Sequence, residues 1–176
     1  NTQYATFSIN YIDGSGMIAD RHYGIPFGST AIATTINLGS STSSSFNDTN
    51  PASSYTHSAF AMNSVLTYWY VPDNITIDAV HWFHGADADA GDDTATHLMA
   101  YTVDTGNGST GGDLSGGVVV ADGANITNAG QEQIYYQSMT IQSADVDAGK
   151  VVLFTFASDT NSSDYSIIAT VKYHIR

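Results

Sequence analysis

Apolar and polar residues alternate one by one in several separate stretches of this chain, and no other feature limits its fold so strongly. The stretch Tyr4 to Ile12 alternates in this way, and the stretch Tyr165 to His174 does so most regularly. Successive side chains of a β-strand leave on opposite faces, so a period of two predicts strands with one buried and one exposed face. No window of about eleven residues carries a clear helical stripe. The sequence therefore predicts an all-β protein.

The segment from Ile75 to Asp104 is the centre of the predicted fold. It reads as a strand, an acidic tip at Gly85 to Asp93 and a returning strand, which together predict a β-hairpin. Strict alternation assigns the first strand two faces, with Ile75, Ile77, Ala79, His81 and Phe83 on one and Thr76, Asp78, Val80, Trp82 and His84 on the other.

Further strands are predicted wherever β-branched and aromatic residues gather. These segments are Ser29–Leu38, Val65–Val71, Val118–Ala121, Ile134–Ile141 and Val151–Phe156. The last is apolar on both faces, which predicts a central strand. We count about eight to nine strands in one domain, residues 1–176, with its core in 65–176 and less regular strands and loops in 1–64. A jelly-roll-like antiparallel β-sandwich is favoured over an immunoglobulin-type one, because the loops are long and no Cys-Trp-Cys core exists.

The charge balance limits the partners. Four Lys and Arg residues stand against seventeen acids, giving a formal net charge of −13. Nucleic acids and anionic membranes are bound through Lys and Arg, so neither is an expected partner. The chain has no cysteine, which excludes disulfides and zinc–thiolate sites. No apolar run approaches the ~20 residues of a membrane-spanning helix.

Four aspartates in the acidic tip are the first candidate site: Asp87, Asp89, Asp92 and Asp93. Calcium takes six to eight oxygen ligands, and closely spaced aspartates can supply several. The spacing does not fit an EF-hand, because Gly91 occupies the fifth place and no glutamate closes the loop. A solvated tip is the favoured interpretation, and a Ca²⁺ site is the alternative.

Histidines and aromatic residues supply the other candidates. His81 and His84 point to opposite faces of one strand, so they cannot share a metal without a bulge, and His97 could meet only one of them. Tyr68 and Tyr70 lie on one face of their strand and, with Trp82 and His84, are candidate contacts for an oligomer interface or a glycan. Core or interface packing is the favoured interpretation.

No catalytic motif is present. The chain lacks a Gly-x-Ser-x-Gly elbow, and the glycine-rich TGNGSTGG stretch at Thr105 to Gly112 lacks the lysine of a phosphate-binding loop. We therefore expect a protein without enzymatic activity.

The last hundred residues or so resemble structural proteins of marine tailed bacteriophages, including cyanophages. The points of likeness are AVHWFHGAD, HLMAYTVD, GGDLSGGVVVADGA, YYQSMTIQSADVDAGKVVLFTF and DYSIIATVKYHI. The first seventy residues or so carry no such likeness. The motifs are patterns of strands and turns, so no catalytic residue is implied.

This resemblance implies a β-sandwich protein on the virion surface, typically a homotrimer. Its partners would be further copies of itself and the major capsid protein or other virion proteins, as in a capsid decoration or cement protein. One alternative is a receptor- or glycan-binding domain of a tail fibre or spike, with contacts from the loops Gly39–Ser54, Gly85–Asp93 and Thr105–Gly117. Another is a secreted, calcium-dependent carbohydrate-binding or adhesin module.

Overall fold

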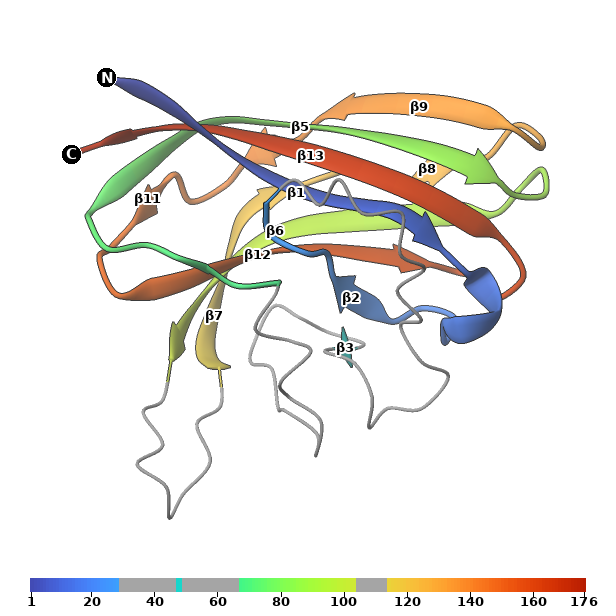
Figure 1. Cartoon of the computed structure of the whole chain (residues 1–176), viewed down its shortest axis with the longest axis horizontal. Coiled ribbons are helices and arrows are strands. Elements are labelled where there is room, and N and C mark those ends of the chain that lie inside the picture. The colour runs from blue at the N-terminus through green and yellow to red at the C-terminus, as the bar shows by residue number, and fades with distance from the viewer. Residues whose placement is uncertain (29–46, 49–66, 104–113) are drawn as a thin grey trace, which may run out of the picture.

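The computed structural model describes residues 1–28, 47–48, 67–103 and 114–176, and these form two antiparallel β-sheets packed in two layers (Figure 1). The predicted all-β sandwich is confirmed. The strand predicted at Ser29–Leu38, most of the loop Gly39–Ser54 and most of Thr105–Gly117 lie outside the described residues. Within the described ranges, no helix is long and apolar enough to cross a membrane.

Sheet A is the five-stranded sheet. Its strands are β1 (Thr2–Ile12), β13 (Asp164–Ile175), β5 (Ile75–Asp87), β11 (Asp145–Val146) and β9 (Gln133–Ser138). β13 lies between β1 and β5, and the free side of β5 pairs with β11 at its start and with β9 near its end.

Sheet B is the eight-stranded sheet, and several of its strands are short. Its strands are β2 (His22–Gly24), β3 (Asn47–Asp48), β4 (Trp69–Tyr70), β6 (Asp93–Val103), β7 (Leu114–Asp122), β8 (Ile126–Thr127), β10 (Thr140–Ile141) and β12 (Lys150–Ser158). A 3₁₀ turn, η1 (Gly14–Gly16), joins β1 to the segment that leads into β2, and the Asp13 side chain caps it.

The pairing of the long strands is that of a jelly roll. The first strand, β1, pairs with the last, β13, and the next pair inward is β2 and β4 with β12. β5 then pairs with β9, and β6 pairs with β7 at the centre of the sequence. This nested series of antiparallel pairs is a long hairpin wound into two sheets, so the jelly-roll prediction is confirmed.

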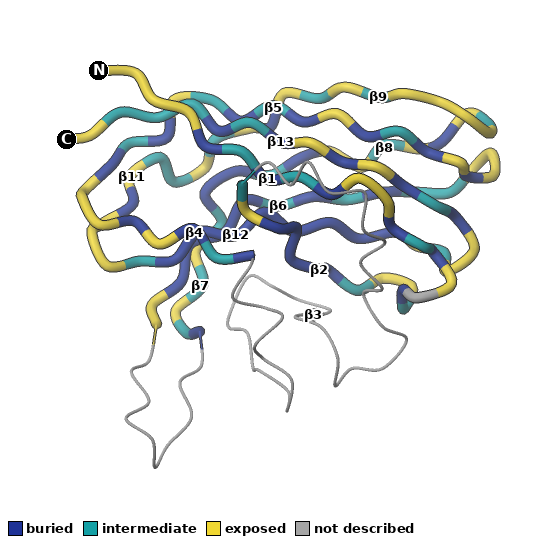
Figure 2. Tube along the Cα trace, viewed as in Figure 1, coloured by how far each residue is buried: buried dark blue, intermediate teal, exposed yellow. Residues whose placement is uncertain are grey.

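The main core lies between the two sheets, where the strands carry many buried residues (Figure 2). It is rich in aromatic rings. Phe7 of β1 and Trp82 of β5 pack against Phe154 of β12, with ring centroids 6.2 and 6.1 Å apart. β12 is buried at every position from Val151 to Ser158, because β6 flanks it on one side and β2 and β4 on the other. The prediction of a central strand here is confirmed.

A second apolar cluster lies on the outer face of sheet B. Its buried members are Met99, Tyr101, Leu114, Val151 and Leu153, with Tyr68 and Val119 packed against them. They alternate along β6 and β12 with residues of the main core, so both faces of sheet B carry buried apolar side chains.

The predicted hairpin at Ile75 to Asp104 is wrong. β5 belongs to sheet A and β6 to sheet B, so the two strands do not pair, and the acidic tip crosses from one layer to the other. Alternation specifies which side of a strand is apolar but not which strand lies next to it. In this chain β13 and β9 occupy the two edges of β5.

The predicted faces of β5 are also wrong in part. Ile77 is paired with Tyr173 and Ala79 with Lys172, so Asp78 is an extra residue on β5 and forms a β-bulge. The bulge exchanges the two faces of the strand. Ile75 and Ile77 before it and Trp82 and His84 after it therefore all point into the core.

Candidate interaction surface

Trp82 and His84, two of the candidate binding residues, lie inside the protein. Their side chains are 1 % and 2 % exposed, and their rings stack with centroids 4.7 Å apart. The Trp82 indole N–H donates to Oε1 of Gln137 at 3.0 Å. The prediction that these two residues contact a glycan or a partner is wrong, because the bulge at Asp78 turns this part of the strand inward.

Burial also sets the protonation of His84. Tyr135 stacks on its ring at 5.0 Å, and Phe156 and Tyr165 lie 6.2 and 6.0 Å away. Removal from water disfavours the charged imidazolium and lowers the pKa of His84 from 6.5 to about 4. Its Nδ1 has no hydrogen-bond partner among the described residues. His84 is therefore a neutral core residue at physiological pH.

Tyr68 and Tyr70 do share a face, as their spacing predicts, and Trp69 between them points into the main core. Tyr68 packs against the second apolar cluster on sheet B, whereas Tyr70 is 60 % exposed. Both residues point away from the main core in which Trp82 and His84 are buried, and β4 belongs to the other sheet. The four candidate binding residues therefore do not form one site.

The four aspartates of the tip turn to separate partners. Oδ2 of Asp92 accepts from the Asp89 backbone N–H at 3.2 Å and from the Ser163 hydroxyl at 2.7 Å. Oδ1 of Asp93 accepts from Thr127, and Asp87 is exposed at the end of β5. In the described part of the chain, no group of three or more His, Asp or Glu side chains is placed to hold a metal ion.

His97 meets neither His81 nor His84, because it lies on the outer face of sheet B. Its ring stacks on His22 at 4.7 Å, and its Nδ1 lies 3.0 Å from Oδ1 of Asp122 without pointing at it as a hydrogen bond requires. Nδ1 of His22 lies 3.0 Å from the Thr155 hydroxyl. Burial and the nearby His97 lower the pKa of His22 to about 4. These polar side chains form a row across four strands, β2, β12, β6 and β7. The row is structural.

The outer face of sheet A carries the exposed apolar surface of greatest interest. We call Phe83, Ile134, Tyr136 and Ile168 the outer apolar patch. Ile134 is 79 % exposed, and the other three are about half exposed. Phe83 of β5 lies directly opposite Tyr136 of β9 and Ile168 of β13, so the patch is continuous across three strands. Large apolar patches on a protein surface often mark an interaction site.

A hollow opens in this patch at Gly85. The residue is paired with Ile134 on one side and Ser166 on the other, and Phe83 and Ile168 complete the wall. A Cβ added at Gly85 would meet only the Cβ of Ser166, at 3.9 Å. The missing side chain at Gly85 and the small one at Ser166 therefore leave room for an apolar group of a partner.

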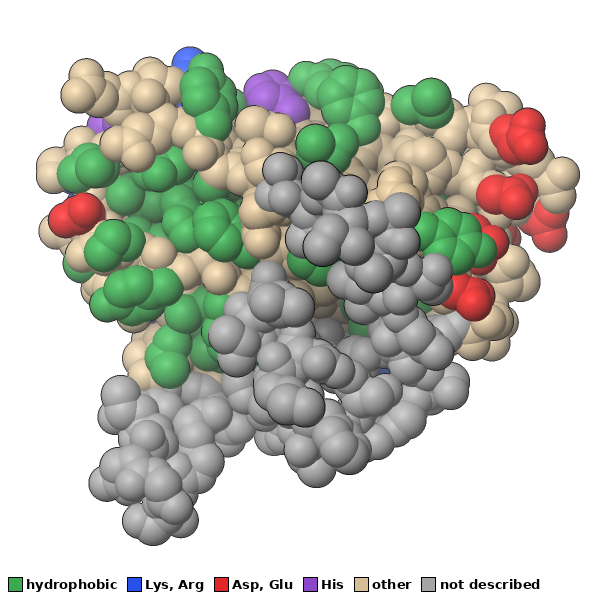
Figure 3. All heavy atoms as spheres, in the orientation of Figure 1, with side chains coloured by type: hydrophobic (Ala, Val, Ile, Leu, Met, Phe, Trp, Pro, Cys, Tyr) green, Lys and Arg blue, Asp and Glu red, His purple; other side chains and the backbone are tan. Residues whose placement is uncertain are grey.

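Three successive rows of residues on this face contain no acid. Their members, from β9 toward β1, are Ser138, His81, Thr170 and Thr6, then Tyr136, Phe83, Ile168 and Ser8, then Ile134, Gly85 and Ser166. Figure 3 shows hydrophobic side chains beside a histidine along the upper rim, over this sheet. Nδ1 of His81 lies 3.0 Å from the Ser138 hydroxyl and 2.7 Å from the Tyr136 hydroxyl, which fixes the Tyr136 side chain.

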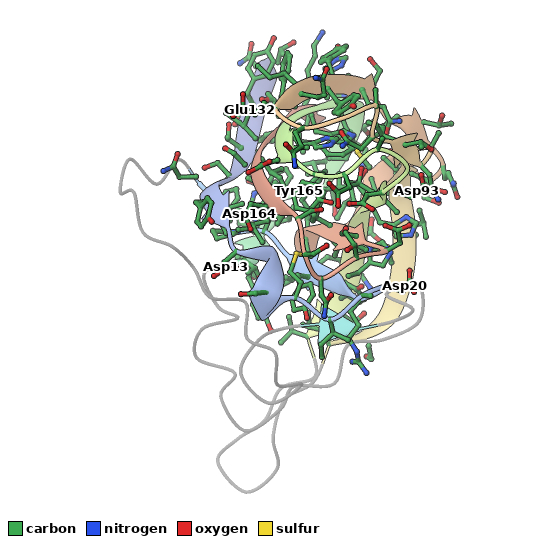
Figure 4. All side chains as sticks on the ribbon, turned by 90° about the vertical axis from the view of Figure 1, so that its right-hand side faces the viewer. Asp13, Asp20, Asp93, Glu132, Asp164 and Tyr165 are labelled. Carbon is green, nitrogen blue, oxygen red and sulfur yellow. The ribbon has the colours of Figure 1, made fainter. Side chains whose placement is uncertain are left out.

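Most of the acidic side chains that Figure 3 shows lie at one end of the sandwich, where the tip crosses between the sheets. Figure 4 looks at this end and shows Asp13, Asp93, Glu132 and Asp164 spread around it. Here the Tyr11 hydroxyl donates to Oδ2 of Asp164 at 2.6 Å, and this hydrogen bond raises the pKa of Tyr11 to about 12. The charge of the protein is therefore unevenly distributed along its strands.

Sequence reasoning did not find the outer apolar patch. Strict alternation placed Phe83 with Ile75 and Ile77, which would bury it, and the bulge at Asp78 reverses that assignment. The available signal was the pair Ile134 and Tyr136, two residues apart and therefore on one face of their strand. No protein-family model matches the chain, and no curated protein sequence matches it.

Proposed function

We propose that this chain is a non-enzymatic structural protein displayed on the surface of a virion, where it associates with copies of itself and decorates the capsid. Three observations support the proposal: the sequence resemblance to marine tailed-phage proteins, the jelly-roll topology, and the acid-free outer apolar patch. Jelly rolls are common in capsid and lectin domains, but fold alone does not decide between roles. The observation that carries the proposal is the patch.

The energetics of the patch suit the association of copies of the chain. Fully burying a large apolar side chain is worth roughly 1.5–3 kcal/mol, so four side chains that are about half exposed or more could contribute roughly 3–6 kcal/mol before the costs of association. A protein that binds only the assembled shell stabilises that shell by mass action. This is how a decoration protein of this size would act.

Capsid binding tests the proposal directly. The purified protein is incubated with particles of marine tailed bacteriophages, the particles are pelleted, and their rupture temperature is measured. We expect the protein to pellet with the particles and to raise the rupture temperature. Ile168→Glu, which places an acid in the patch, should weaken capsid binding because single copies bind with less avidity than associated copies, whereas Val118→Glu, on the exposed part of β7 in sheet B, should not.

Two other outcomes would count against capsid decoration. Binding to host cells but not to capsids would favour the receptor- or glycan-binding alternative, with Phe83 and Tyr136 in place of the buried Trp82 and His84 as the aromatic contacts. Absence of binding to both capsids and cells would overturn the proposal.

A further inference from the structure

We infer that the outer apolar patch is a two-fold contact between two copies of this chain, with the strands of the two copies running in opposite directions. The inference rests on the proposed function and names the partner of its central surface. It replaces the homotrimer expected from the resemblance with a symmetric pair.

The distribution of charge restricts where two copies can meet. Each chain carries a formal charge of −13, so contact through the acidic end would place like charges together. The three central rows on the outer face of sheet A contain no acid; the first acids beyond them are the paired residues Asp87 and Asp164 toward one end and Asp78, which contacts His174, toward the other. The patch is therefore a surface on which copies can approach with little repulsion.

The two ends of sheet A differ in charge, which selects the orientation. One end carries Asp87 and Asp164, whereas Lys172 lies on the same face toward the other end, opposite Tyr4 of β1. At that other end, Arg176 is paired with Asp145 and Asp147, and Asp78 contacts His174. A two-fold axis that crosses the strands at right angles places the end with Lys172 and Arg176 of each copy over the more acidic end of its partner.

The shape of the patch fits the same axis. If the axis passes between the row of Tyr136, Phe83 and Ile168 and the row of Ile134, Gly85 and Ser166, each row faces the other across the contact. Phe83 of one copy then lies over the Gly85 hollow of the other and Ile168 lies over Ser166, while Tyr136 packs against Ile134. A two-fold contact requires the patch to be complementary only to itself, whereas a ring of three requires two different complementary surfaces.

The size of the face is sufficient for a specific pair. Strands about ten residues long at ~3.3 Å per residue, in four strands ~4.8 Å apart, give a face of roughly 33 by 19 Å, or about 600 Å² in projection. Side-chain relief makes the accessible area larger than its projection. A stable interface buries about 800 Å² per partner, and two such sheets can pack face to face as in a β-sandwich.

Sedimentation equilibrium of the full chain with three variants tests the inference. Gly85→Val fills the hollow without a clash inside one chain, and Lys172→Glu removes the opposite charge that faces the acidic end. Lys150→Glu makes the same charge change on sheet B, where the Lys150 ammonium contacts Thr102, and serves as the control. We expect a dimer at micromolar concentration, a dissociation constant raised about tenfold or more by each of the first two changes, and no change with Lys150→Glu.

Other results would overturn the two-fold contact. A wild-type protein that is monomeric at ~100 μM, or one with the mass of three chains, contradicts it, as does a Gly85→Val variant that dimerises like the wild type. These results are separate from the proposed function, because a monomer or trimer that still pellets with capsids leaves capsid decoration standing. Failure of capsid binding by an intact dimer would reject the function and keep the contact.

Discussion

The outer faces of the two sheets carry similar apolar side chains and differ in what happens to them. On sheet B, Val151 and Leu153 alternate with core residues and are fully buried in the second apolar cluster. On sheet A, Phe83 and Ile168 occupy equivalent outward positions and are about half exposed. Burial of an apolar face inside the chain contributes to folding, whereas an apolar face that remains exposed is available to a partner.

This difference assigns different roles to residues of the same type. Leu153 lies opposite Met99 of β6 and packs in the second apolar cluster, so its contacts form only when the chain folds. Ile168 contributes little to the free energy of folding, because much of its side chain remains in water. Three predictions test how far the contrast between the two faces extends.

Truncation should separate the two faces most clearly. Leu153→Ala should lower the free energy of unfolding by about 2–5 kcal/mol, because it removes buried methyl groups and leaves a cavity. Ile168→Ala, on the outer face of sheet A, should lower it by less than about 1 kcal/mol. Urea titrations at a protein concentration where self-association is negligible measure both values. Equal losses in the two variants would contradict the contrast.

Acid should destabilise the fold through the buried His84 of β5. Because the pKa of His84 is about 4 when folded and ~6.5 when unfolded, the unfolded chain binds more protons between these values. Stability should therefore be complete above about pH 6.5 and fall as the pH drops toward 4, by up to about 3 kcal/mol from this residue.

A matched pair of variants isolates that contribution. His84→Phe removes the titrating group from the core, so its stability should fall less steeply between pH 6.5 and 4 than that of the wild type. Ile168→Ala, on the outer face of sheet A, changes no titrating group and should keep the wild-type slope apart from a constant offset. The same slope in all three proteins would show that burial of His84 does not control the acid response.

The smallest expected effect concerns Gly85. Gly85→Val places a β-branched residue in an open position of a strand, where it should raise the free energy of unfolding of the monomer by roughly 0.5–1 kcal/mol. If the Gly85→Val variant unfolds less readily than the wild type but associates more weakly with itself, the hollow serves a contact with a partner. Marked destabilisation of the monomer would show instead that the hollow is needed for folding.

Much of the fold was predictable because alternation is a local property. The strands at Tyr4–Ile12 and Tyr165–His174 follow from their own side chains, and the continuous apolar run at Val151–Phe156 correctly indicated a central strand. The hairpin at Ile75–Asp104 failed because the partners of β5 lie far away in the sequence. The local pattern of apolar and polar residues contains no information about which strands pair with β5.

The candidate site was less predictable, since a single inserted residue changes every assignment after it. The parity argument correctly separated His81 from His84, because no bulge lies between them. It failed for Trp82, His84 and Phe83 relative to Ile75, because Asp78 adds one residue to β5. Asp78 is the only acidic residue from Ile75 to Ala86, but an acidic residue in a strand does not by itself indicate a bulge.

The sequence by itself determined the class of structure: an acidic all-β chain whose strands have apolar sides. These properties depend on composition and on a period of two, both of which are read directly from neighbouring residues. Only the tertiary structure decided which apolar sides are buried and which remain exposed. That choice depends on long-range pairing and on the bulge at Asp78, which together turn Trp82 into the core and Phe83 toward solvent.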